Sequence, residues 1–405
     1  MGRHVLFISA AFYPNGASGA HRPSQFAKYL PEHGWTPFVV RVDWTPANCG
    51  ACYAPSLAER GDFCETVSVP YGGGPKNGFG RLARRLLKPA FPYRYPFCLC
   101  RSMLAAADAA AAQRKFDAIW STYRGGVNHY VASRISRKYG IPWVADFRDL
   151  PDQSYDTPET RRAVRAEIRT CASAAALVTT SPALTAIAAK RHQVPVHTIL
   201  NGFDPDDFPE PDARVSSRFC MRYFGVLYEF RDPAPLLEAV DLLAGEGGVN
   251  LDDLQLEFYG SSPERVAELV GAHRCAKVVR CEAWVDRHRM IPLQQKASVL
   301  LLLKSPGAGG SIPAKLFEYL AAKRPILNIP GDGDVVDGIL RETGAGMSLA
   351  SPEEIARTLG QWYKEWRASG AVPFRGVPER IAAYSRRSQA GTLAKILEGV
   401  CGGKT

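Results

Sequence analysis

One stretch of the sequence decides the fold. It reads Gly309-Gly310-Ser311-Ile312-Pro313-Ala314-Lys315-Leu316-Phe317-Glu318-Tyr319-Leu320-Ala321-Ala322-Lys323-Arg324-Pro325-Ile326-Leu327. The apolar run Val299–Leu303 precedes it and predicts a buried strand. The glycines predict a loop, and Pro313 suits the first position of a helix. The apolar run Pro325–Ile329 predicts the next strand. A strand, loop, helix and strand in this order form the repeating unit of a parallel α/β sheet.

The same order recurs along the whole chain. In the first half we expect six strands, at Val5–Ser9, Phe38–Val42, Ala118–Ser121, Trp143–Asp146, Leu177–Thr180 and Val196–Leu200. The helices expected between them are Ser24–His33, Met103–Arg114, Val127–Tyr139, Glu159–Cys171 and Pro182–Arg191. In the second half the expected strands are Met221–Gly225, Leu254–Tyr259, Lys277–Cys281, Val299–Leu303 and Pro325–Ile329. Its expected helices are Ala234–Ala244, Pro263–His273, Arg289–Ala297, Pro313–Ala322, Val335–Thr343 and Pro352–Arg367.

A polar stretch, Asp204 to Val215, separates the two halves and reads as a linker, because it holds three prolines and five acidic residues. We therefore predict two doubly wound, Rossmann-like α/β domains, at residues 1–204 and 216–375. Residues 376–405 are predicted to be a helical segment that packs back on the first domain. Ligands of such sheets bind at the carboxyl ends of the strands, so we expect the sites to face a cleft between the domains.

Composition narrows the class of protein. The 405 residues contain 50 Lys and Arg against 40 Asp and Glu, a formal charge of +10 that suits a partner with phosphates. The densest apolar run is five residues, whereas about 20 are needed to cross a bilayer. Of the ten cysteines, Cys49 and Cys52 form one C-x-x-C pair, but a second well-spaced pair for a zinc site is missing. We therefore expect no metal and reduced thiols in a cytoplasmic protein without a signal peptide.

One segment, residues 66–107, has no acidic residue. Its seven basic residues are Lys76, Arg81, Arg84, Arg85, Lys88, Arg94 and Arg101. Its six interleaved aromatic residues are Tyr71, Phe79, Phe91, Tyr93, Tyr95 and Phe97. Aromatic residues and cations in this mixture are typical of contact with an anionic membrane surface, which would be the inner face of the membrane, through Arg81, Arg84, Arg85 and Lys88. A solvated basic loop packed on the domain and a nucleic-acid contact are the alternatives, and we expect no nucleic acid.

Two constellations in the first half could carry chemistry. The turn Pro14–Ala20 precedes a helix, and Gly19 lets the backbone approach an anionic ligand while Arg22 adds a polar contact. The run Asp146-Phe147-Arg148-Asp149 follows a buried strand, where acids and an arginine are either paired with each other or used. An internal Arg–Asp salt bridge and a merely packed His129 stay open as alternatives.

The second half holds a more specific pattern for a diphosphate. The free N–H groups near Ser311 and Ile312, at a helix start, can hold phosphate oxygens. Lys315 can neutralise phosphate, and Glu318, three residues on and on the same face of the helix, can accept ribose hydroxyls. Arg231 follows the first strand of this half and can reach the same diphosphate.

In these residues, and in Asn201-Gly202-Phe203-Asp204 before the linker, the chain resembles glycosyltransferase family 4, which has the GT-B architecture. The resemblance implies a retaining hexosyltransferase that uses a nucleoside-diphosphate sugar without metal or other cofactor. It implies that Glu318 holds the ribose, that Arg231 stands where the family has a diphosphate-binding lysine, and that Arg148 and Asp149 lie at the catalytic position. His129, on the helix after the preceding strand, is a further catalytic candidate. A saccharide or lipid-linked acceptor and a role in polysaccharide or glycolipid assembly are expected.

Three departures from the family pattern concern the site itself. Val226 replaces a basic residue, Gly310 replaces the first glutamate of the family's acidic pair, and Arg148 replaces its histidine. A catalytically inactive sugar-nucleotide-binding or scaffold protein of polysaccharide assembly is therefore the alternative. A nicotinamide-dependent oxidoreductase would need a dinucleotide fingerprint that the glycine turn does not contain.

Overall fold

The computed structural model describes residues 2–50, 63–71, 97–122, 126–151, 157–210, 216–228, 231–271, 273–305, 310, 312–331 and 333–402. The chain divides into two compact units. Unit 1 comprises Met1–Asn201 and Arg386–Thr405, and unit 2 comprises Gly202–Ser385. The chain thus leaves unit 1 three residues before the predicted boundary at 204, and it returns at Arg386 rather than at residue 376.

The sheet of unit 1 has seven parallel strands in the order β3-β2-β1-β4-β5-β6-β7. The strands are β1 (Arg3–Ile8), β2 (Trp35–Asp43), β3 (Glu65–Pro70), β4 (Ala118–Thr122), β5 (Trp143–Phe147), β6 (Ala176–Thr179) and β7 (Val196–Thr198). The order reverses between β1 and β4, which makes a topological switch point, and ligands of such sheets bind where the strands end beside it. The edge strand β3 was not predicted, because its residues are mostly polar or half-exposed and it ends in proline.

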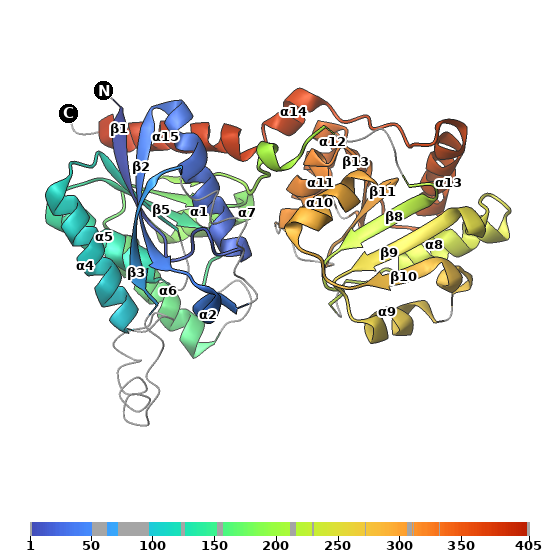
Figure 1. Cartoon of the computed structure of the whole chain (residues 1–405), viewed down its shortest axis with the longest axis horizontal. Helices are drawn as coiled ribbons and strands as arrows, with labels where there is room; N and C mark the ends of the chain where they lie inside the picture. Colours follow the sequence, from blue (N-terminus) through green and yellow to red (C-terminus); the bar gives the residue numbers. More distant parts are fainter. Residues whose placement is uncertain are drawn as a thin grey trace. The chain divides into compact units, whose positions relative to one another are not determined.

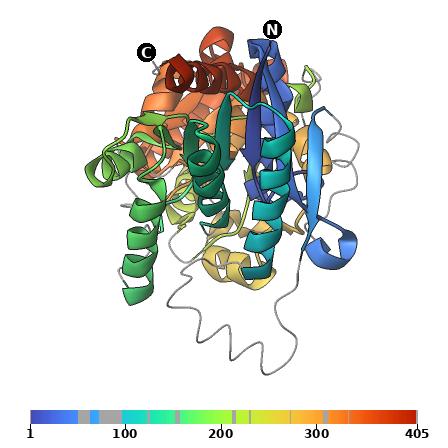
Figure 2. The ribbon, with the colours of Figure 1, turned by 90° about the vertical axis from the view of Figure 1, so that its left-hand side faces the viewer.

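Helices cover both faces of this sheet (Figures 1 and 2). The helices of unit 1 are α1 (Ser18–Tyr29), α2 (Pro46–Cys49), α4 (Phe97–Gln113), α5 (Val127–Tyr139), α6 (Pro158–Cys171), α7 (Pro182–Arg191) and α15 (Arg386–Gly402). One apolar core joins the sheet to α4 and α5, and the other joins it to α1 and α15. The C-terminal helix therefore completes a face of the first unit.

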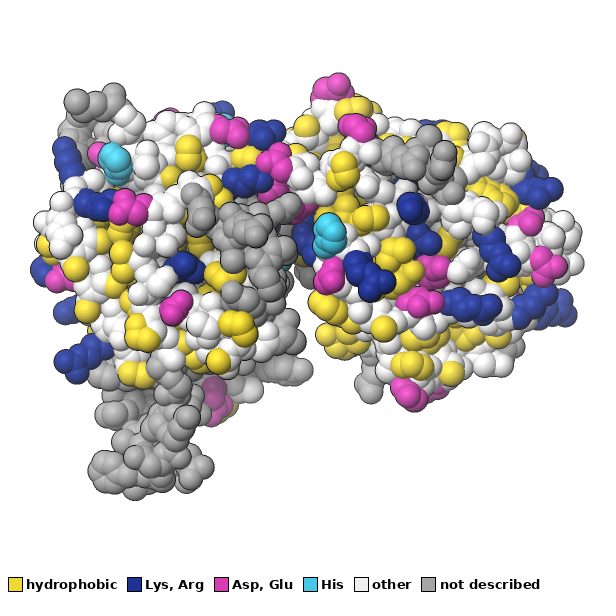
Figure 3. Space-filling view, viewed as in Figure 1, with side chains coloured by type: hydrophobic (Ala, Val, Ile, Leu, Met, Phe, Trp, Pro, Cys, Tyr) yellow, Lys and Arg dark blue, Asp and Glu magenta, His cyan; other side chains and the backbone are white. Residues whose placement is uncertain are grey.

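Unit 2 repeats the plan with six parallel strands in the order β10-β9-β8-β11-β12-β13. They are β8 (Phe219–Phe224), β9 (Leu254–Tyr259), β10 (Val279–Glu282), β11 (Val299–Leu303), β12 (Ile326–Ile329) and β13 (Gly346–Ser348). The helices are α8 (Ala234–Gly245), α9 (Pro263–Val270), α10 (Arg287–Gln295), α11 (Ala314–Ala321), α12 (Val335–Thr343), α13 (Pro352–Ser369) and α14 (Pro378–Ala382). Its switch point lies between β8 and β11. On the face that Figure 3 shows, basic and acidic side chains of this unit are interspersed.

Two differences from the sequence prediction bear on the site. Helix α1 begins at Ser18 rather than near Ser24, with Pro23 inside it, so Gly19 and Arg22 belong to the helix itself and not to the preceding turn. Residues 376–385, including α14, lie in unit 2, and the return to unit 1 starts only with α15. Within the described ranges, none of the helices combines the length and apolar character needed to cross a bilayer.

Candidate functional site

The switch point of unit 2 brings a glycine and a lysine into close contact. Gly225 follows β8 directly and has a φ of +137°, a conformation that other residues rarely adopt. A Cβ atom at this position would lie 2.6 Å from the Nζ of Lys315, the second residue of α11. Only glycine therefore allows the lysine amine to pack against the end of β8.

The Lys315 amine is buried without a hydrogen-bond acceptor in the part of the chain that the structure describes. Its Nζ lies 4.0 Å from the centroid of the Tyr223 ring in β8. Burial, and next the positive charge of Arg231, lower the pKa of Lys315 to about 7, whereas Glu318 opposes the shift. A cation held in this way lacks the anionic partner that a buried charge requires.

Arg231 reaches the same place from the start of the segment that leads into α8. Its Nη1 donates to the Tyr223 hydroxyl at 3.3 Å and to the Val226 carbonyl at 3.2 Å. Its guanidinium lies 5.1 Å from the centroid of the Tyr228 ring. Its Nε is buried, and no acceptor for it is found among the described residues. The two predicted diphosphate-binding side chains thus meet around one tyrosine.

Glu318 lies three residues after Lys315 on α11, and its side chain is 21% exposed. It forms an ion pair with Arg287, the first residue of α10. Arg287 also donates to Asp207 through Nη2 at 3.0 Å. Arg287 and Asp207 were not predicted as site residues, although three basic residues cluster at the start of α10, at Arg287, His288 and Arg289.

The loop ahead of α11 is described only in part. Ser311 lies outside the described residues, and Ile312 is partly buried two residues before the helix. The N–H group of Gly310 donates to Asp334 at 3.0 Å, and Asp334 also pairs with the Lys304 amine at 3.3 Å. Gly310, which stands where the resembled family has a glutamate, is therefore held by a carboxylate from the cap of α12.

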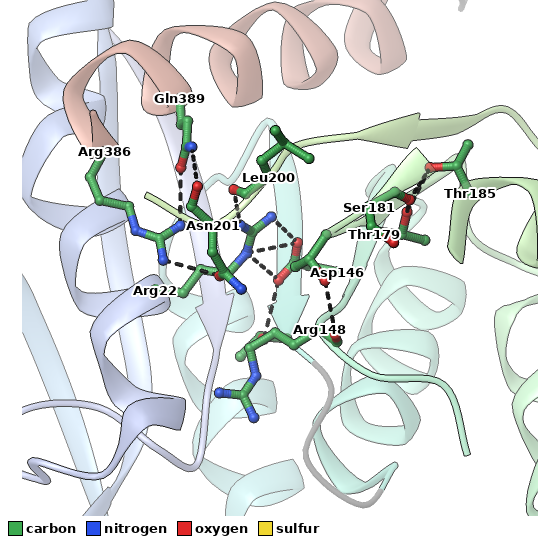
Figure 4. Close-up of polar contacts among 12 residues, drawn as sticks. Arg22, Asp146, Arg148, Thr179, Ser181, Thr185, Leu200, Asn201, Arg386 and Gln389 are labelled. Atoms are coloured by element: carbon green, nitrogen blue, oxygen red, sulfur yellow. Dashed lines mark hydrogen bonds and ion pairs between the residues drawn. The ribbon is translucent and has the colours of Figure 1, made fainter. Parts of the chain in front are cut away.

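In unit 1 the structure places Arg22 in the core (Figure 4). It is 1% exposed and pairs with Asp146 of β5, which is fully buried, at 2.7 Å. A further nitrogen, Nη1, donates to the carbonyl of Leu200 at 2.8 Å. Asp146 thus pairs with an arginine of another element. The internal Arg–Asp salt bridge left open by the sequence is present between Arg148 and Asp149. Arg22, predicted to meet the acceptor, is thus enclosed by groups of unit 1.

A second buried arginine, Arg386 at the start of α15, lies beside this pair and was not found from the sequence (Figure 4). It donates to three neutral oxygens, those of Gln25 at 3.0 Å, Gln389 at 3.0 Å and Asn201 at 3.1 Å. Burial, and next the charge of Arg22, place the pKa of Arg386 well below its usual range. No carboxylate bonds it among the described residues; its acceptors are the neighbouring Gln389 and two sequence-distant amides, those of Gln25 and Asn201.

Arg148 and Asp149 follow β5, nearer the surface. A Cβ atom at Gly19 would lie 3.0 Å from an Arg148 nitrogen, so these two predicted residues are in contact. The Arg148 and Asp149 side chains are 3.9 Å apart and 21% and 68% exposed. Both can therefore meet a ligand.

His129 occupies a different environment. It is only 2% exposed, and its Nδ1 lies 2.7 Å from the Ser121 hydroxyl. Its ring packs against Phe147, with centroids 4.5 Å apart. Burial, and next the charge of His192, lower its pKa to about 3, so the ring is neutral at physiological pH. The structure thus places His129 in the core of unit 1.

Comparisons with known proteins agree with this architecture. A family model described as "Glycosyl transferase 4-like domain" matches residues 19–202. No curated protein sequence matches the chain. Sucrose-phosphate synthase from Thermosynechococcus elongatus superposes with a TM-score of 0.64 at 15% identity, covering 98% of both chains.

Two further solved structures are similar over the whole chain. Anabaena HepE, solved with UDP and glucose, gives a TM-score of 0.63 at 12% identity over 98% of this chain and 100% of that one. WaaG, a glycosyltransferase involved in lipopolysaccharide biosynthesis, gives a TM-score of 0.53 at 15% identity, covering 99% of this chain and 100% of that one. These likenesses show that the chain has the GT-B fold of two Rossmann-like units, the first of which matches a glycosyl transferase 4-like domain.

Proposed function

We propose that the protein is a glycosyltransferase that moves a sugar from a nucleoside-diphosphate sugar to a saccharide or lipid-linked acceptor. The observation that carries the proposal is the pair of cations around Tyr223, since Lys315 and Arg231 both keep a buried nitrogen without an acceptor in the described chain. The match of residues 19–202 to a glycosyl transferase 4-like domain supports it, as does HepE, which was solved with UDP and with UDP-glucose.

The proposed chemistry uses the cations at the moment of bond cleavage. Negative charge grows on the diphosphate as the glycosidic bond breaks, and fixed cations stabilise that charge best when water is excluded. Lys315, Arg231 and the N-terminus of α11 supply positive charge for this purpose. A leaving diphosphate needs no protonation, and its oxygen can take the acceptor proton if attack occurs on the same face, with retention. We therefore propose transfer that requires no metal.

Glu318 is proposed to bind the ribose hydroxyls of the donor. Its carboxylate is partly exposed and is oriented by Arg287, which Asp207 holds in turn. A carboxylate that pairs with one arginine still has lone pairs that can accept hydrogen bonds from the two hydroxyls of a ribose. On unit 1, Arg148 and Asp149 next to Gly19 are the residues proposed to meet the acceptor sugar, whereas Arg22 and His129 support them from the core.

The basic and aromatic segment, residues 66–107, is relevant to whether the acceptor is lipid-linked. Most of it, including Arg81, Arg84, Arg85 and Lys88, lies outside the described residues. Its contact with an anionic membrane surface stays a prediction from composition. Binding of the purified protein to vesicles of anionic and of neutral lipid, compared with the variant that has all four residues replaced by Gln, would test it.

The decisive experiment measures release of nucleoside diphosphate from a panel of sugar nucleotides, with saccharide and lipid-linked acceptors. We expect turnover with one donor and a donor KM at least ten-fold higher in Glu318→Ala. Glu238→Ala, an exposed residue of α8, is the matched control and should leave the KM unchanged. Binding of a sugar nucleotide without transfer to any acceptor would favour the scaffold alternative, and failure to bind any of them would overturn the proposal.

A further inference from the structure

The side chain of Tyr223 contacts both cations of the proposed donor site. It is fully buried at the end of β8. Its hydroxyl accepts from Arg231 and donates to the Val226 carbonyl, each at 3.3 Å, and the face of its ring lies under the Lys315 amine. An aromatic face attracts a cation through its quadrupole without adding a negative charge. Burial raises the pKa of Tyr223, so the phenol stays neutral.

The other groups around Lys315 do not neutralise it. From the loop after β8 it faces Arg231, a like charge. On its own helix it faces Glu318, whose carboxylate is paired with Arg287, and the hydroxyl of Tyr319 accepts from the Phe224 N–H. No carboxylate bonds the Lys315 amine within the described ranges. The amine therefore sits in a site built by a neutral ring, a cation and a glycine backbone.

We propose that Tyr223 is a positioning residue that holds Lys315 and Arg231 together without neutralising them, so that a bound diphosphate supplies the missing anion and Lys315 takes up a proton. The inference rests on the proposed function, because it assumes that a nucleoside diphosphate binds there. The reaction is a simple protonation, in which the neutral amine gains one proton from the solvent and becomes an ammonium ion beside the phosphate oxygens.

The lowered pKa of Lys315, about 7, sets the size of the effect. At pH 8 an amine with this pKa is about nine-tenths neutral, so binding should take up roughly 0.9 proton. At pH 6 the amine is already charged, and its own share of the uptake should fall to about 0.1 proton. A negative ligand next to the amine raises its pKa again, which is the source of the uptake.

Isothermal titration of the protein with UDP at pH 8 tests the proton uptake. The titration is done in HEPES and in Tris, whose heats of ionisation differ, so the difference in measured heat gives the number of protons. Lys315→Arg should bind UDP with no uptake, because a guanidinium is always charged. Lys296→Arg, an exposed lysine of the same unit, is the matched control and should keep the wild-type uptake.

Tyr223→Phe tests the positioning role. It keeps the ring under Lys315 and removes the hydroxyl that accepts from Arg231, so we expect unchanged uptake and about three- to ten-fold weaker affinity for UDP. Wild-type affinity in this variant would overturn the role of Tyr223. UDP binding without proton uptake at pH 8, or equal uptake in Lys315→Arg, would overturn the inference while the proposed function stands. No binding of UDP or any other nucleoside diphosphate would overturn both.

Discussion

Each unit of this molecule places two cationic groups with buried nitrogen atoms next to one another, but the two pairs are satisfied very differently. In unit 1, Arg22 bonds Asp146 and the Leu200 carbonyl, and three amide oxygens surround Arg386. In unit 2, the Lys315 amine and the Arg231 Nε have no acceptor in the described part of the chain. The first arrangement stabilises the fold, and the second leaves positive charge available to a ligand.

The contrast follows from the cost of burying charge. A buried ion is tolerated when its partners are supplied by the fold, and removing one partner costs several kcal/mol. A buried cation without a partner lowers stability until an anion arrives, and this trade of stability for function is common at binding sites. The number of hydrogen-bond acceptors around a buried cation therefore distinguishes a structural cation from a candidate ligand-binding one. The residue type alone does not make this distinction.

The largest effect of a single substitution is expected in unit 1, on the free energy of unfolding. Asp146→Asn removes the only carboxylate that Figure 4 shows bonded to Arg22, so two buried positive charges lose their counter-charge. We expect a loss of about 3–5 kcal/mol in the free energy of unfolding, measured by urea denaturation. Asp149→Asn, at a 68% exposed side chain, should change it by about 0.5 kcal/mol or less. Equal effects of the two changes would contradict the structural role of Asp146.

In unit 2 the larger effect should fall on transfer. Arg231→Ala or Lys315→Met should each remove about 2–4 kcal/mol of transition-state stabilisation. This loss corresponds to a kcat/KM roughly 30- to 1,000-fold lower. The double variant should lose less than the product of the two, because both cations act on one diphosphate. Steady-state kinetics of the four proteins measure the coupling. Strictly multiplicative losses would mean that the two side chains act on different groups.

Removing the Lys315 amine, which should lower the rate of transfer, should raise the free energy of unfolding. The Lys315 amine is charged in the unfolded chain up to its usual pKa of about 10.5, but in the folded protein only below about 7. The cost of the buried charge is thus fully present at pH 6 and falls as pH rises above 7. Lys315→Met should raise the free energy of unfolding by about 1–3 kcal/mol at pH 6 and by less at pH 9. Urea denaturation at both pH values checks this, and a gain that grows with pH would contradict it.

The smallest expected effect concerns metal ions. Since side chains are proposed to supply the positive charge at the diphosphate, treatment with EDTA should change the rate of transfer by less than about two-fold. The assay compares chelated enzyme with enzyme to which magnesium or manganese is added back. Activity that disappears on chelation and returns with either ion would show that the cations of unit 2 are insufficient.

Periodicity was enough to predict the fold, because every long strand and helix carries an apolar pattern of its own. It failed for β3, β13 and the first turns of α1, where a polar edge strand, a three-residue strand and a proline inside a helix hide the pattern. The pairing of Lys315 with Arg231 was predictable, since both follow strands that are neighbours in the sheet. The roles of Arg386 and Arg287 were not, because their partners lie 185 and 80 residues away in the chain.

The position of α15 has a consequence for the order in which this protein can fold. Unit 1 is interrupted after Asn201 by residues 202–385 and is completed only by α15, a helix that is translated after all of unit 2. At the usual 5–20 residues per second, about 10–40 s of synthesis separate Asn201 from Arg386. During that interval the apolar face later covered by Leu393 and Leu397 is open on the nascent chain. The second unit can form its core first, so the last unit to finish is the one that emerged first from the ribosome.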